Sequence, residues 1–377
     1  MYNKNGFSST VMSVVLLGVA VLLSGCGGGG GSGSSGGATL TQMGGSLQGN
    51  PLVLASSVST FAGTAGVIGS KDGTVGTELN YPSSVTTDGV NLYVADTSSH
   101  TIRKIVIATG AVTAFAGSAG VTGATDGIGA AARFYSPYGI TTDGANLYVA
   151  DTFNHTIRKI VISTGAVTTV AGSAGAKGST DGTAAARFNF PFGITTDSAN
   201  LFVGDTGNHT IRKIVIATGA VSTVAGSAGV IGSADGTAAA RFNQPTGIIT
   251  DGANLYVADT NNDTIRKIVI ATGAVTTLAG SAGVAGSTDG TGVAARFRSS
   301  YGITTDGTNL YVADTFNHTI RKIVIATGAV TTLAGSAGVS GITDGTAAKF
   351  YYPEGITTDG ASLYVTDTLN HTIRRIQ

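Results

Sequence analysis

Residues 137–160 read PYGITTDGANLYVADTFNHTIRKI, and this stretch decides the fold. Polar and apolar residues alternate within three short runs, and the polar groups Asp-Gly and Asn-His separate these runs. Such alternation, with turn residues between the runs, is typical of antiparallel strands. A tight-turn signal, Thr-Gly at 164–165, leads into a fourth run of the same kind. The pattern predicts a four-stranded antiparallel unit with strands at residues 139–142, 146–151, 156–162 and 166–171.

The same unit occurs six times along the chain. Each copy carries an Asp-Thr pair at the end of its second strand, and the six aspartates are Asp96, Asp151, Asp205, Asp259, Asp314 and Asp367. A four-stranded sheet with two apolar faces is not stable alone, and radial stacking of the copies buries both faces. Because no distinct capping copies are visible, we expect an all-β, six-bladed β-propeller of four-stranded antiparallel blades rather than a linear solenoid.

The two ends of the repeat region are complementary. The chain stops at Gln377, part-way through the third strand of the last copy, so that copy lacks a fourth strand. Residues 58–63 (VSTFAG) match a fourth strand that has no first three strands before it. We therefore expect residues 58–63 to pair with the third strand of the last copy and close the ring.

With these features in place, residues 137–160 resemble an NHL repeat. The long loops with the pattern AGSAG…TDG…AARF resemble those of bacterial NHL-repeat proteins. The resemblance covers residues 58–377 and implies a six-bladed propeller. It implies little about function, because NHL propellers bind proteins, bind RNA or work as lyases.

The N-terminal residues resemble a bacterial lipoprotein signal. An apolar segment at residues 11–23 (VMSVVLLGVAVLL) would span about 20 Å as a helix, which is too short for a bilayer core of about 30 Å. Residues 23–26 (LSGC) resemble a lipobox, which implies a signal peptide at residues 1–25 and lipidation of Cys26, the single cysteine.

A tether is expected between this signal and the propeller. Residues 27–37 consist entirely of Gly and Ser, so we expect residues 26–57 to form the lipidated cysteine and a flexible linker. The resemblance implies export and anchoring in the bacterial cell envelope. Gly27 stands where an inner-membrane retention signal would place Asp, which favours the outer membrane.

The charge balance bears on partners. Lys and Arg number 21, Asp and Glu number 21, and the net charge is zero, so no basic excess is available for nucleic acid. We expect a monomer that contacts the membrane through its lipid and binds no nucleic acid.

Most charged residues recur in every copy and are expected to have structural roles. Asp151 can pair with Arg158 across a hairpin or cap the intervening loop. Asp126 and its equivalents in the long loops lack the alternating acidic pattern of a calcium loop, so we expect them to stabilise turns.

A histidine recurs between the second and third strands of five copies, and Asp263 replaces it in the remaining copy. The five are His100, His155, His209, His318 and His371. Strand spacing places these side chains roughly 12 Å from the propeller axis and equally far from one another. Zinc ligands must all lie within about 2.1 Å of one ion, so we expect no shared metal and no cofactor.

The copies differ mainly just before their first strand, which is the innermost strand of each blade. These segments should surround the mouth of the central channel, where aromatic side chains with one Arg and one Glu suit a peptide or glycan. The candidate ligand-binding residues are Tyr81, Tyr138, Phe190, Phe192, Gln244, Arg298, Tyr301, Tyr352 and Glu354. The alternative is that the aromatic residues only plug the channel.

Two functions follow from these features. We expect a non-catalytic binding or scaffold propeller of the cell envelope that presents a protein-, peptide- or glycan-binding face at the channel mouth. The chain contains no recognisable catalytic motif, and no catalytic residue is assigned. The alternative is a metal-dependent enzyme that resembles propeller lyases or lactonases, for which Glu354 is the one off-pattern carboxylate near the mouth.

Overall fold

A computed structural model describes residues 51–377 of the chain. The predicted signal peptide, Cys26 and all but the last residues of the predicted tether lie outside the described residues. Within residues 51–377, no helix is both long and apolar enough to cross a membrane.

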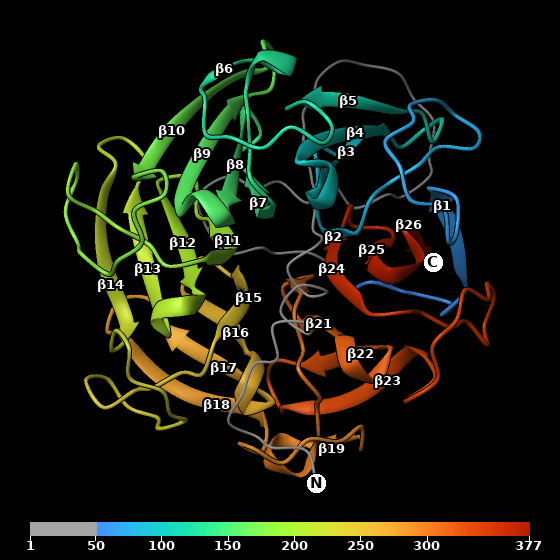
Figure 1. Ribbon diagram of the computed structural model, residues 1–377. Coiled ribbons are helices and arrows are strands. Elements are labelled where there is room, and N and C mark those ends of the chain that lie inside the picture. The colour runs from blue at the N-terminus through green and yellow to red at the C-terminus, as the bar shows by residue number, and fades with distance from the viewer. Residues whose placement is uncertain (1–50) are drawn as a thin grey trace, which may run out of the picture.

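Six antiparallel sheets surround a central axis, which confirms the predicted all-β, six-bladed propeller (Figure 1). The first blade contains β2 (Pro82–Thr87), β3 (Asn91–Asp96), β4 (Thr101–Val106) and β5 (Val112–Ala116). The second contains β7 (Pro137–Thr142), β8 (Asn146–Asp151), β9 (Thr156–Val161), β10 (Ala166–Gly172) and the short β6 (Gly127–Ile128). The third contains β11 (Pro191–Thr196), β12 (Asn200–Asp205), β13 (Thr210–Val215) and β14 (Ala220–Gly226).

The remaining blades repeat this order from the axis outward. The fourth blade contains β15 (Pro245–Thr250), β16 (Asn254–Asp259), β17 (Thr264–Val269) and β18 (Ala274–Gly280). The fifth contains β20 (Ile303–Thr305), β21 (Asn309–Asp314), β22 (Thr319–Val324), β23 (Ala329–Gly335) and the short β19 (Gly290–Thr291). The sixth contains β24 (Pro353–Thr358), β25 (Leu363–Asp367), β26 (Thr372–Ile376) and β1 (Val58–Ala62).

Short 3₁₀ turns complete the described elements. One joins the second and third strands of each blade: η1 (Thr97–Ser99), η3 (Thr152–Asn154), η4 (Thr206–Asn208), η5 (Thr260–Asn262), η7 (Thr315–Asn317) and η8 (Thr368–Asn370). Two more lie in long loops, η2 (Gly129–Ala131) and η6 (Gly292–Ala294).

The blades differ from the prediction in strand number. The second and fifth blades have five strands, because β6 pairs with β10 and β19 pairs with β23. The long loops that hold β6 and β19 each have one residue more than the corresponding loops before the third and fourth blades. The extra residue lets the loop add a short strand to the outer edge of its blade.

The predicted ring closure is confirmed. β1 pairs antiparallel with β26, with Val58 opposite Ile376, so the sixth blade combines both ends of the described chain. The residues just before β1, which the sequence assigns to the tether, also lie against the propeller. Leu52 is buried, and its backbone N–H donates a hydrogen bond to Asp306 (3.0 Å), in the turn between β20 and β21.

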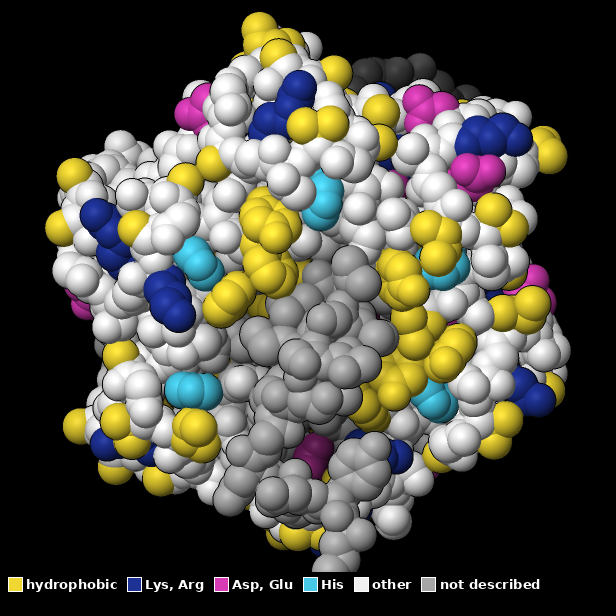
Figure 2. Space-filling model, in the orientation of Figure 1, with side chains coloured by type: hydrophobic (Ala, Val, Ile, Leu, Met, Phe, Trp, Pro, Cys, Tyr) yellow, Lys and Arg dark blue, Asp and Glu magenta, His cyan; other side chains and the backbone are white. Residues whose placement is uncertain are grey.

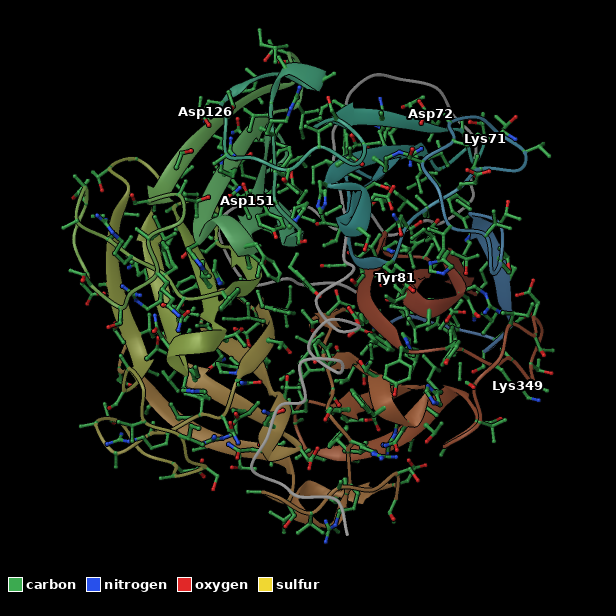
Figure 3. The ribbon with its side chains drawn as sticks, viewed as in Figure 1. Lys71, Asp72, Tyr81, Asp126, Asp151 and Lys349 are labelled. Atoms are coloured by element: carbon green, nitrogen blue, oxygen red, sulfur yellow. The ribbon has the colours of Figure 1, made fainter. Side chains whose placement is uncertain are left out.

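A buried arginine ties each long loop to its blade, and the pairing predicted for Asp151 is confirmed. Figure 3 labels Asp151 at the end of its strand and Asp126 in the long loop. Arg158 has no exposed surface and donates to Asp151 and to Asp126, both at 2.7 Å. Its guanidinium also lies 5.2 Å from the centre of the Phe134 ring. The same double ion pair is formed by Arg103, Arg158, Arg212, Arg266, Arg321 and Arg374. Because Asp126 also accepts the backbone N–H of Thr169 (3.1 Å), the loop covers the outer edge strand of the blade.

Glycines bring the innermost strands of adjacent blades together. A Cβ atom added to Gly193 would overlap the carbonyl oxygen of Thr246, and one added to Gly302 would overlap that of Glu354. Only glycine permits this backbone approach. The residue before the glycine of each inner strand lines the narrow central channel that results.

Candidate functional site at the channel mouth

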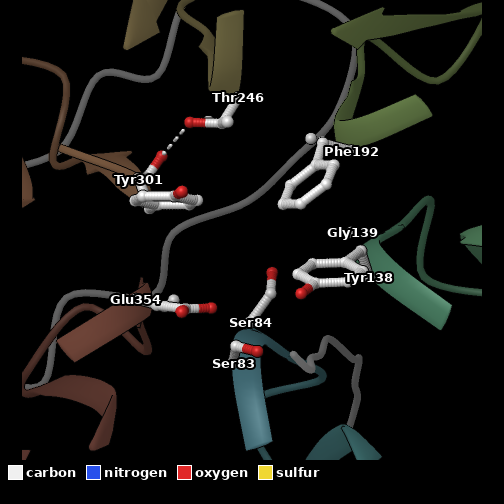
Figure 4. A pocket seen from close by; sticks show the side chains of 12 residues that line it. Ser83, Ser84, Tyr138, Gly139, Phe192, Thr246, Tyr301 and Glu354 are labelled. Carbon is white, nitrogen blue, oxygen red and sulfur yellow. Dashed lines mark hydrogen bonds between the residues drawn. The ribbon is translucent and has the colours of Figure 1, made fainter. Parts of the chain in front are cut away.

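The residue before each inner-strand glycine, or before Ser84 in the first blade, lines a cavity at the propeller axis (Figure 4). Each blade contributes one such side chain, and these six axial residues are Ser83, Tyr138, Phe192, Thr246, Tyr301 and Glu354. With their neighbours they enclose about 300 Å³, including the open end of the cavity. Four of the nine predicted ligand-binding residues are among them.

The axial ring divides into an aromatic part and a polar part. The rings of Tyr138 and Phe192 lie 4.0 Å apart between centres, and that of Tyr301 lies 6.2 Å from Phe192. The Thr246 hydroxyl donates to the carbonyl oxygen of Tyr301 (3.3 Å). In Figure 4, Glu354 lies between Tyr301 and Ser83 in the ring and faces Phe192 across the axis. The aromatic side chains therefore fill part of the channel, as the plug alternative expects, and leave a cavity beside the carboxyl group.

Glu354 is the one acidic side chain in this ring. Its side chain is 3% exposed, and among residues 51–377 its Oε2 atom has no hydrogen-bond partner. Burial raises the pKa of the Glu354 carboxyl to about 8, an effect that Ser83 partly offsets. Burial, with a smaller contribution from the Glu354 charge, also raises the pKa of the Tyr301 phenol. Glu354 is therefore mostly protonated at neutral pH.

Two aromatic clusters lie outside the axial ring. In the first aromatic cluster, the Phe153 ring lies 5.0 Å from that of Tyr135 and 5.3 Å from that of Phe190. In the second aromatic cluster, the Tyr352 ring lies 4.7 Å from that of Phe316 and 5.6 Å from that of Tyr351. Tyr135 and Tyr351 are exposed by 40% and 38%. Figure 2 shows apolar side chains gathered on two sides of the central region of this face.

The recurring histidine joins adjacent blades. His155 Nδ1 accepts the backbone N–H of Phe190 in the next blade (3.1 Å), and both residues have left-handed backbone conformations, with φ of 57° and 50°. The same contact joins Tyr81 to His371, Ser136 to His100, Phe190 to His155, Gln244 to His209, Ser299 to Asp263 and Tyr352 to His318. Because Nδ1 accepts a hydrogen bond, the neutral imidazole carries its proton on Nε2. Burial lowers the pKa of all five histidines.

The other predicted site residues therefore lie at the blade junctions rather than at the axis. The Tyr81 ring packs edge-on against His371, with centres 4.6 Å apart. The Gln244 side-chain oxygen accepts a hydrogen bond from Asn261 (3.0 Å). Arg298 is exposed at the mouth, and its positive charge lowers the pKa of His318.

Sequence reasoning missed Ser83, Ser84 and Thr246, which line the same cavity. The available signal was their place in the repeat, since Ser83 and Thr246 occupy the position of Tyr138. It also missed the exposed aromatic residues Tyr135 and Tyr351, which stand beside predicted residues in the varying segments.

The axial donors do not match a metal centre. Among residues 51–377, no three His, Cys, Asp or Glu side chains lie close enough together to hold an ion. The six axial residues offer one carboxyl group, two aliphatic hydroxyl groups and three aromatic rings. Catalytic zinc sites have three protein ligands drawn from His, Cys, Asp and Glu. The residues present therefore do not fit the group that the enzyme alternative requires.

These features define the class of protein, a closed six-bladed β-propeller with an axial cavity. No protein-family model matches the chain. It has NHL-repeat proteins as homologues: human NHL repeat-containing protein 2 is 32% identical over 346 residues, which cover 81% of this chain and 47% of that protein. Protein SUPPRESSOR OF QUENCHING 1, chloroplastic, of Arabidopsis thaliana is 30% identical over 325 residues, 79% of this chain and 30% of that protein. The chain thus spans about half or less of the length of these relatives.

Solved structures share the fold. A structural genomics protein of unknown function from Bacteroides thetaiotaomicron has a TM-score of 0.66 and 24% identity, over 85% of this chain and 75% of that one. An auxiliary nutrient binding protein from the same organism has a TM-score of 0.63 and 18% identity, over 85% and 76% of the two chains. At these identities the likeness shows the architecture alone.

Proposed function

We propose that this chain is a non-catalytic NHL-type binding propeller of the bacterial cell envelope. Its channel mouth binds a protein, peptide or glycan ligand, and lipid on Cys26 anchors it to a membrane, by our expectation the outer membrane. The observation that carries the proposal is the mouth itself, which combines two partly exposed aromatic clusters with a buried carboxyl group, one oxygen of which has no hydrogen-bond partner among residues 51–377.

The distribution of side chains supports binding at this face. The repeated Asp and Arg side chains pair with one another inside every blade and so are already engaged. The aromatic clusters differ from blade to blade, and exposed Tyr side chains contribute large contact areas to binding surfaces. The fold relative from Bacteroides thetaiotaomicron that is called an auxiliary nutrient binding protein is in keeping with such a role.

The first described residues support an orientation for the anchored protein. Leu52 contacts Asp306, which lies in the turn between β20 and β21. The mouth is at the start of the innermost strand of each blade and this turn is at its end, so Leu52 lies on the face opposite the mouth. The described chain thus begins on the face opposite the mouth, which supports the proposal that the anchored protein directs its mouth away from the membrane.

Glycan and peptide arrays test the proposal. The probe is the full chain with Cys26→Ser, which removes the expected acylation site, and the test variant adds Tyr351→Ser and Tyr352→Ser. The control adds Val90→Ser, which changes an exposed apolar residue in a turn of the opposite face. We expect the mouth variant to lose at least tenfold in affinity for any ligand found while the control does not change. Equal affinity for the two variants would refute a ligand site at the mouth.

A further inference from the structure

The axial cavity combines two features that narrow its ligand class. One is the Glu354 carboxyl group, buried, with Oε2 unpartnered among the described residues. The other is the set of three aromatic side chains of the axial ring, Tyr138, Phe192 and Tyr301, of which Tyr301 is next to Glu354 and Phe192 faces it. A buried polar atom without a partner opposes folding, so its presence beside an open cavity calls for a ligand group that completes it.

The charge of the cavity selects among ligands. The residues that line it include no Lys, Arg, His or Asp, so Glu354 is its only group that becomes charged near neutral pH. An anion would be repelled by the carboxylate and would find no cation there. An organic ammonium fits both features, since its charge complements the carboxylate and its alkyl groups lie favourably against aromatic faces.

We propose that the axial cavity binds an organic ammonium group, with the nitrogen beside Glu354 and the attached carbons against Tyr138, Phe192 and Tyr301. This rests on the proposed function, because it names the ligand chemistry of the same mouth. A lysine side chain, a peptide N-terminus and a small free alkylammonium ion share this chemistry.

Binding is coupled to the loss of a proton. The Glu354 carboxyl has a pKa of about 8 in the empty cavity, so below that pH the arriving cation displaces the proton from the carboxyl oxygen to solvent. The other titratable side chains of the ring are Tyr301 and Tyr138, and burial raises the pKa of the Tyr301 phenol, so Tyr301 stays neutral in this range. Affinity for a cation that cannot itself lose a proton should rise about tenfold per pH unit below pH 8 and level off above it.

Titration calorimetry of the full chain with Cys26→Ser and tetramethylammonium tests the inference. We expect binding that strengthens about tenfold from pH 6 to pH 7, with up to one proton released per ion bound. Neutral tert-butanol, similar in size, should not bind. Glu354→Gln should lose at least tenfold in affinity, and Glu78→Gln, which changes the one other glutamate of the chain, should leave it unchanged.

A second variant keeps the test decisive if Glu354→Gln fails to fold. Phe192→Leu retains the carboxyl group and removes an aromatic face, and it should weaken tetramethylammonium binding several-fold. Competition by methylammonium and by a lysine-containing peptide distinguishes a small free alkylammonium ion from an ammonium group carried on a peptide. Equal binding of tetramethylammonium and tert-butanol, or no binding of either, would overturn the inference. The array test stands apart from it, because a mouth ligand that is unaffected by Glu354→Gln refutes the ammonium site and leaves the binding propeller intact.

Discussion

Replacing Glu354 with Gln should stabilise the protein at alkaline pH and have little effect at pH 4. In the folded chain, burial raises the pKa of this carboxyl from 4.5 to about 8. The unfolded chain therefore loses its proton at lower pH than the folded chain does. The stability that Glu354 contributes is fully present below pH 4.5 and is lost as the pH rises to about 8.

The size of the effect follows from the two pKa values. Each pH unit between them corresponds to about 1.4 kcal/mol, so the interval from 4.5 to about 8 corresponds to about 5 kcal/mol. The side chain is 3% exposed, so little solvent screening reduces this figure. Glutamine has nearly the same shape and stays neutral, so the Glu354→Gln variant should not lose this stability as the pH rises.

Urea unfolding of the full chain and of Glu354→Gln from pH 4 to pH 9 measures the difference directly. Selective ¹³C labelling of glutamate adds an independent reading, because the chain contains two glutamates and Glu78→Gln assigns the pair of carboxyl signals. We expect the Glu354 signal to titrate near pH 8. A stability difference between variant and parent that stays constant over this range, or a Glu354 signal that titrates near pH 4.5, would refute the account.

Three further predictions concern the contacts that hold the blades. His155→Ala should destabilise the protein by about 1–3 kcal/mol because it leaves the Phe190 N–H without its acceptor, whereas His155→Asp, which copies Asp263, should cost less; chemical unfolding at pH 7 compares them. Burial lowers the pKa of His155, so the stability that its neutral imidazole contributes is present above pH 6.5 and is lost as the pH falls. In thermal melts, His155→Asp should therefore lose less stability than the parent between pH 7 and pH 5. Arg158→Met should destabilise by about 3–5 kcal/mol, because two aspartates lose their partner; an effect below 1 kcal/mol would show that the ion pairs are dispensable.

The fold was predictable because its signals are local and repeated. The strand at 146–151 was placed to the residue, since apolar alternation and turn residues bound it on both sides. The innermost strand begins two residues earlier than predicted, at Pro137, because it pairs there with Asp151, the last residue of the next strand. The fifth strands, β6 and β19, escaped prediction because one inserted loop residue carries no pattern of its own.

The candidate site was predictable as a region and not as a set of residues. Repeat comparison located the varying segments at the channel mouth, but residues two apart in one segment have different surroundings. Phe190 has a left-handed backbone and packs edge-on against His155, with ring centres 4.7 Å apart, while Phe192 lines the axis. No pattern in a single copy distinguishes these two positions.

The amino-acid sequence by itself determined the number of blades, the strands of each blade and the closure of the ring through residues 58–63. These properties depend on alternation and periodicity, which short-range sequence carries. Only the tertiary structure decided which residues meet at the axis, because that depends on glycines of one blade admitting the backbone of the next. It also decided the state of Glu354, since the pKa of a carboxyl group follows from burial among side chains of other blades, and no neighbour in sequence determines that environment.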